Sequence, residues 1–120
     1  MNNIILDIKK ELKANMNGVA SSHCRQTEDY RVNWGIELPR VAQIAAEFEG
    51  SRELAQALWN ESVRECKILA CMLMPTADFA EEICDIWAES IRTEEIATMF
   101  SLYLVQRLPY ASTKAYEWIA

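Results

Sequence analysis

The hydrophobic positions of this chain recur every three or four residues, which is the spacing of amphipathic helices. Two segments of the first half show this pattern, through Ile5, Ile8, Leu12 and Met16 and then through Val41, Ile44, Ala45 and Phe48. Pro39 suits the first turn of the second helix, where its missing N–H costs nothing. Residues 17–37 lack a period and contain Gly18 and Gly35, so they predict a long connection.

The rest of the chain alternates between two kinds of predicted helix. Residues 66–74 and 96–105 are apolar almost all round, which predicts helices that are buried on most sides. Each follows a segment with one apolar stripe, which predicts a helix with one face in water; the stripes contain Leu54, Ala57 and Leu58, then Phe79, Ile83, Ile86 and Trp87. Ser51 can cap one of these helices, and Pro75 ends the first buried one. The pattern predicts an all-α fold.

A short sequence recurs before the two buried helices. WNESVR at residues 59–64 returns as WAESIR at residues 87–92, which is 28 residues later. Self-similarity at such a period is typical of stacked helical repeats. We therefore expect Trp59 and Trp87 to stack between repeats. The chain predicts one domain, residues 1–120, folded as an α-α superhelix.

The serines of the recurring motif predict how the buried helices begin. Ser62 and Ser90 are expected to accept hydrogen bonds from the first free N–H groups of the helices that follow. Glu65, three residues after Ser62, would complete a capping box.

The C-terminal segment predicts an unfinished array. Trp118 follows Trp87 by 31 residues, so residues 111–120 would begin a further repeat whose second helix is missing. The array is then a truncated or unusually short one. An uncapped repeat end exposes apolar surface, so we expect a homodimer through the C-terminal helix.

Charge and cysteine usage restrict the classes of function. The formal net charge is −6, and the segment 78–95 carries seven acidic residues against Arg92 alone. Such a chain is not a natural polyanion binder. The four cysteines form no C-x-x-C pair and His23 is the only histidine, so we expect no metal site and no cofactor. Free thiols, the lack of a secretion signal and the lack of a membrane-length apolar run predict a cytoplasmic protein without a membrane partner.

From Trp34 onward the residues resemble the DNA alkylation repair proteins, which are HEAT-like-repeat alkylpurine DNA glycosylases. WGIELPRVAQIAAEF and then ELAQALWNESVRECKILACML carry the resemblance, and it covers roughly the last two-thirds of the chain. The matching residues are Gly35, Ile36, Pro39, Arg40, Ile44, Ala45 and Glu47, then Leu54, Ala55, Leu58, Trp59, Glu65, Ile68, Leu69 and Ala70.

The resemblance implies a superhelix of HEAT-like repeats whose concave face holds duplex DNA. Active members excise positively charged N3- or N7-alkylated purines with a Trp and an Asp four residues later, whose carboxylate stabilises the charged sugar. The sequence departs from the family at this pair. Alignment of the following apolar run places Glu94 at the Trp position and Thr98 at the Asp position. Glu95 lies next to Glu94, so the catalytic candidates are Glu94 and Glu95. Acids in the first turn of a helix also stabilise its dipole, and their position favours that role over a catalytic one.

Two functions remain open. The first is a DNA alkylation repair-like protein that binds DNA weakly or with a bias for lesions, with glycosylase activity in doubt; the candidate phosphate contacts are Arg25, Arg31, Arg40, Arg64 and Arg92. The second is a non-catalytic helical-repeat scaffold that binds protein. The family resemblance favours the first, and the acidic balance favours the second.

Overall fold

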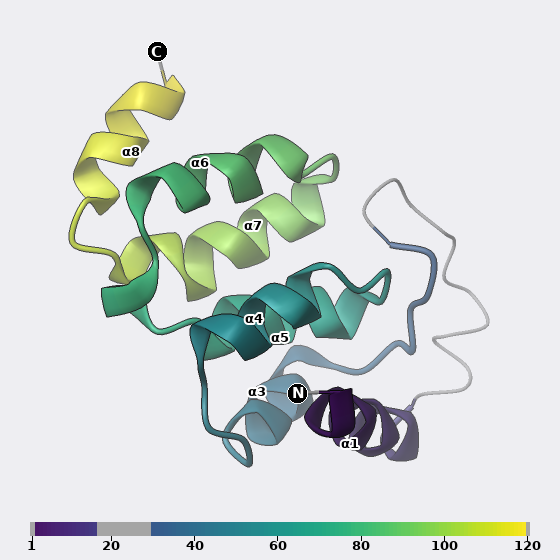
Figure 1. The fold of residues 1–120 in the computed structure, drawn as a ribbon. Helices are drawn as coiled ribbons and strands as arrows, with labels where there is room; N and C mark the ends of the chain where they lie inside the picture. The colour runs from purple at the N-terminus through teal and green to yellow at the C-terminus, as the bar shows by residue number, and fades with distance from the viewer. Residues whose placement is uncertain (1, 17–29, 120) are drawn as a thin grey trace.

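The computed structural model describes residues 2–16 and 30–119, and these residues form seven α-helices and no strand (Figure 1). In chain order the helices are α1 (Asn2–Ala14), α3 (Leu38–Ala45), α4 (Arg52–Trp59), α5 (Arg64–Leu73), α6 (Glu81–Ser90), α7 (Glu94–Tyr103) and α8 (Ala111–Ile119). Short 3-10 turns, Thr76–Asp78 and Val105–Arg107, follow α5 and α7. The predicted all-α fold is confirmed.

The helices stack in successive layers along the molecule, which measures 40 × 28 × 22 Å (Figure 1). The layer of α1 and α3 is followed by that of α4 and α5 and then by that of α6 and α7, while α8 lies at the end opposite α1. Helix α5 packs against α3 on one side and α7 on the other, so these three form the inner row. This arrangement confirms the predicted superhelix of HEAT-like repeats.

Burial follows the predicted alternation for α5 and α6, but the prediction that α7 is buried on most sides is wrong. Only Ile96, Met99 and Phe100 of its ten residues are buried, and Leu102 is half exposed because no described helix covers that side of α7. Seven of the ten residues of α5 are buried, whereas α6 buries only Cys84 and Trp87 and leaves Ile86 largely in water. Pro39 occupies the first turn of α3, and the Ser51 hydroxyl accepts a hydrogen bond from the Leu54 N–H, as predicted for the start of α4.

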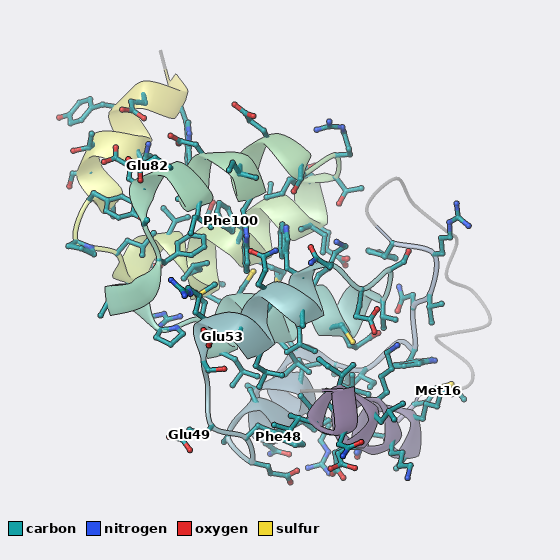
Figure 2. The ribbon with its side chains drawn as sticks, in the orientation of Figure 1. Met16, Phe48, Glu49, Glu53, Glu82 and Phe100 are labelled. Carbon is teal, nitrogen blue, oxygen red and sulfur yellow. The ribbon has the colours of Figure 1, made fainter. Side chains whose placement is uncertain are left out.

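The two repeated tryptophans are the centre of the core. Trp59 and Trp87 stack with ring centroids 4.4 Å apart and planes 5° from parallel, which confirms the prediction. Phe79 meets Trp87 edge-on at 5.0 Å. Phe100, which Figure 2 labels in the interior, lies 6.0 Å from the Trp59 ring and 6.3 Å from the Trp87 ring. Aromatic packing therefore joins the α4–α5 layer to the α6–α7 layer.

The prediction that Ser62 and Ser90 cap helices is wrong. Ser90 is the last residue of α6, and its hydroxyl donates to the Trp87 carbonyl. The Ser62 hydroxyl accepts from the Arg31 N–H, and α5 begins after Val63 without a side-chain cap. Thr93 caps α7 instead, because its hydroxyl accepts from the Ile96 N–H.

The cause of the error at Ser90 is the period of the motif. Several side-chain hydrogen bonds between successive layers join residues 31 apart, including the pairs Gln56–Trp87, Arg64–Glu95 and Phe79–Tyr110. The recurring motif has a period of 28 residues, so the serine of its second copy, Ser90, is the last residue of α6 rather than the cap of the next helix.

Gly50 gives the sharpest test of the packing between the α3–α4 connection and the end of α5. A Cβ atom on Gly50 would lie 2.2 Å from the carbonyl oxygen of Leu73, a backbone atom at the end of α5. We therefore expect Gly50→Ala to lower the free energy of unfolding by roughly 1–3 kcal/mol, the usual cost of overpacking. Urea denaturation measures it. The exposed Ser112→Ala is the control and should change stability by less than about 0.5 kcal/mol; equal midpoints for both variants would contradict the contact.

Candidate functional site

The N-terminal ends of α5 and α7 are joined by an extended segment, residues 30–37. The N–H groups of Arg31 and Val32 both donate to the Ser62 carbonyl at 3.0 Å, and the Arg64 N–H donates to the Val32 carbonyl at 2.9 Å. These bonds form an isolated parallel bridge between Val32 and Val63, which adds no sheet to the described residues. The segment thereby lies against the start of α5, where the recurring motif had predicted only a helix cap.

Glu65 anchors this segment from inside the protein. Its side chain is completely buried, and its two carboxylate oxygens accept from the Trp34 N–H at 3.1 Å and the Ile36 N–H at 3.3 Å. The Arg64 guanidinium donates to the same carboxylate at 2.8 Å. Glu65 therefore does not form the predicted capping box, because its oxygens face the extended segment instead of the start of its own helix.

Arg64 extends the network to α7. Its Nε lies 3.2 Å from each carboxylate oxygen of Glu95, and its Nη1 donates to the Ile36 carbonyl at 3.1 Å. Tyr30 completes the cluster by donating its hydroxyl to Glu95 at 3.0 Å. Burial lowers the pKa of Arg64, but the negative charges of Glu95 and Glu65 outweigh that effect and raise it above its ordinary value. Arg64 is thus a charged tie between two inner helices.

The structure separates the two catalytic candidates. Glu95 faces α5 and is occupied by Arg64 and Tyr30. Glu94 is exposed and lines a groove between α7 and α8. Adjacent helical residues point about 100° apart, so neighbouring acids acquire different surroundings.

The α7–α8 groove has a volume of about 610 Å³. Its walls include Glu94, Thr98, Leu102 and Val105 on the α7 side and Ala115 and Trp118 on α8. The exposed Thr98 hydroxyl donates to the Glu94 carbonyl at 2.9 Å, which is a bond to its own helix backbone. The two positions where the resemblance places the family's Trp and Asp therefore share one groove, and neither holds the family's residue.

The candidate phosphate contacts do not come from one element. Arg31 is exposed on the extended segment; Arg40 on α3 donates to Asn15 at 2.8 Å and Gln43 at 2.7 Å; Arg64 belongs to the buried network. Arg92, before α7, is exposed and donates to the carbonyls of Glu89 and Ile91. Arg25 lies outside the described residues.

The described cysteines are unsuited to nucleophilic chemistry. Burial raises the pKa of Cys66 and of Cys71 to about 12 and that of Cys84 to about 11, so all three are protonated thiols at neutral pH. Among the described residues, no three His, Cys, Asp or Glu side chains gather in a way that would hold a metal ion. No helix in the described part is long and apolar enough to cross a bilayer.

Sequence reasoning missed two roles. Glu65 looked like a helix-capping acid, because its backbone partners lie 31 and 29 residues away and leave no local signal. Trp118 was noticed only for its spacing from Trp87, although it forms a wall of the groove.

The buried carboxylate yields a test of this network. Glu65→Gln replaces one acceptor oxygen by an amide and removes a charge beside Arg64, so we expect the free energy of unfolding to fall by about 2–4 kcal/mol. Chemical denaturation measures the loss. Glu53→Gln, an exposed acid on α4, is the matched control. Equal stability of the two variants would contradict the role given to Glu65.

Comparison with known proteins bears on these residues. A family model described as "DNA alkylation repair enzyme" matches residues 8–120, which is nearly the whole chain. Neither the curated proteins nor the solved structures yielded a match. The chain belongs to the DNA alkylation repair enzyme family, and its function is accordingly related to DNA repair.

Proposed function

We propose that this protein binds alkylated duplex DNA and releases little or no N7-methylguanine or N3-methyladenine from it. The observation that carries the proposal is the state of Thr98. Its hydroxyl donates to the Glu94 carbonyl, at the position that the family resemblance assigns to the catalytic carboxylate. A neutral hydroxyl bound to its own helix cannot stabilise positive charge on a departing sugar as a carboxylate does.

The two neighbouring acids, Glu94 and Glu95, differ in whether their charge is available to replace the missing carboxylate. The Arg64 guanidinium donates to both carboxylate oxygens of Glu95, so the negative charge of Glu95 is already compensated. Glu94 is open to the α7–α8 groove, but it stands where the family has an aromatic wall. One misplaced stabilising group typically lowers a rate by a factor of roughly a hundred or more.

DNA binding rests on the less acidic half of the chain. Residues 1–60 carry seven Lys and Arg against eight Asp and Glu, whereas residues 61–120 carry five against ten. Arg31 is exposed, and half-buried Arg40 is oriented by Asn15 and Gln43, so these two are the proposed phosphate contacts in the described residues.

A protein-binding scaffold is the second candidate. The observation that favours it is the acidic outer face of α6, where Glu82 and Glu89 are exposed. Such a face suits a basic protein partner better than a phosphate backbone.

The excision part of the proposal is tested in a single-turnover assay with methylated duplex. We expect no base release above background from the unmodified protein and measurable release from the Thr98→Asp, Glu94→Trp double variant, which restores the family pair. Robust release by the unmodified protein, abolished by Glu94→Gln, would overturn the proposal and make Glu94 the catalytic group.

The binding part is tested by fluorescence anisotropy with the same duplex across a salt series. Arg40→Gln should weaken binding about three- to tenfold and reduce the salt dependence by roughly one released counterion. Arg52→Gln, an exposed arginine on the outer helix α4, serves as the control. No binding at low salt by the unmodified protein would favour the scaffold function.

A further inference from the structure

We propose that this chain forms a symmetric dimer, in which the α7–α8 groove and the exposed edge of α8 contact the same surface of a second copy. The centre of the contact is formed by Leu102 on α7 and by Tyr116 and Trp118 on α8, which are three large hydrophobic side chains that the single chain leaves exposed. The inference goes beyond the proposed function, because it concerns how two copies of the chain associate.

The groove occupies a position that the preceding layer fills with a helix. Leu102 and Trp118 lie 31 residues after Cys71 on α5 and Trp87 on α6, which is the spacing of several hydrogen bonds between layers. Cys71 and Trp87 are 0% and 1% exposed, whereas Leu102 and Trp118 are 51% and 43% exposed. Equivalent positions of the repeat are therefore buried in one layer and open in the next.

Helix α7 is the element that covers these positions in the preceding layer. It packs against α5, and Arg107 in the turn that follows it donates to the Cys71 carbonyl at 3.1 Å. Phe100 of α7 lies 6.3 Å from the Trp87 ring. The cover is thus an apolar helix with an aromatic side chain. No described helix covers the equivalent side of α7, so the groove suits an element of the same kind.

Helix α8 offers such an element on the same surface. Tyr116 is 78% exposed on α8, and Trp118 forms a wall of the groove. A two-fold contact joins identical patches, so each patch must contain both a hollow and a ridge. Here the groove is the hollow and the aromatic edge of α8 is the ridge. The α8 helix of one copy can therefore fill the groove of the other.

The charge distribution favours this surface for a contact between copies. Each copy has a formal net charge of −6, so two copies repel each other unless they meet where acids are few. Among the described residues that line the groove, Glu94 alone is charged, and it lies about two helical turns from Leu102. The outer face of α6, in contrast, exposes Glu82 and Glu89. Apolar, aromatic and weakly charged surface is typical of the core of a dimer interface.

A contact through α8 leaves the proposed phosphate contact on α3 accessible. Helices α1 and α3 lie at the end of the molecule opposite α8 (Figure 1). The dimer therefore joins the two copies at their more acidic ends and presents Arg40 of each copy at a far end.

The test is sedimentation velocity of the full chain over a concentration series. We expect a monomer at low concentration and a dimer at high concentration, with no larger species, because a two-fold contact closes on itself. Leu102→Glu places an unpaired charge at the centre of the contact and should raise the dissociation constant by a factor of about ten or more. Ile86→Glu is the matched control, because Ile86 is 63% exposed on α6 and does not line the groove. This variant should dimerise like the unmodified protein.

Acrylamide quenching of tryptophan fluorescence locates the contact without a substitution. Trp34, Trp59 and Trp87 are buried, so Trp118 is the tryptophan that a quencher in solution reaches. We expect quenching to decrease as the unmodified protein dimerises and to be independent of concentration in Leu102→Glu. Circular dichroism establishes that each variant is folded.

Four results would overturn the inference. They are a monomer at every concentration, a dimer in which Trp118 is quenched as strongly as in the monomer, a dimer that persists unchanged in Leu102→Glu, and species that grow beyond two copies, which would show a head-to-tail contact. Duplex binding and base release are measured below the dissociation constant of the dimer. Failure of either proposal then leaves the other intact.

Discussion

The structure depends on the way in which one buried carboxylate is compensated. Moving a carboxylate out of water costs several kcal/mol unless partners replace its hydration. Glu65 meets this requirement with Arg64 and with two N–H groups of the extended segment, those of Trp34 and Ile36. Because these donors lie outside the helix pairs, α5 cannot bury its first turn unless the segment is in place. Arg64 then carries the same constraint to Glu95, so three parts of the chain are positioned together.

This constraint also determines which surface is available for ligands. A guanidinium shared by two carboxylates and a carbonyl is a poor phosphate contact, since DNA would have to displace existing charge partners. Glu95 is a poor group for binding a ligand for the same reason, because its charge is compensated by the same arginine. Glu94 lies outside this network because neighbouring residues of a helix point about 100° apart, so Glu94 and Glu95 face different surroundings. Of these two acids, Glu94 is therefore the one that faces the α7–α8 groove.

Local periodicity was sufficient to predict the elements of the fold. The all-round apolar pattern of residues 66–74 correctly predicted the buried helix α5, and the recurrence of Trp59 as Trp87 correctly predicted their stacking. Both patterns arise from side chains that face a common interior. The Ser90 cap was mispredicted because the 28-residue spacing of the motif differs from the 31-residue spacing of several hydrogen bonds between layers. The Ser62 cap was mispredicted because its hydroxyl accepts from the distant Arg31 N–H. The role of Glu65 could not be read at all. Its partners are backbone N–H groups, which every residue type except proline carries, so no letter of the sequence marks them.

The structure weakens the electrostatic argument against DNA that composition suggests. Two acidic residues of the segment 78–95, Glu81 and Asp85, form ion pairs with the buried Lys114, as does Glu117. The hydrogen bond from Lys114 to Asp85, together with those to its other partners, raises the pKa of Lys114 above its ordinary value. Glu95 is likewise compensated by Arg64. One lysine does not neutralise three carboxylates, but it fixes their remaining charge where α6 meets α8. Repulsion of a phosphate backbone therefore depends on where these acids face rather than on the formal charge of −6. A weakly binding member of a DNA repair family is compatible with this distribution, whereas composition alone would favour only a protein scaffold.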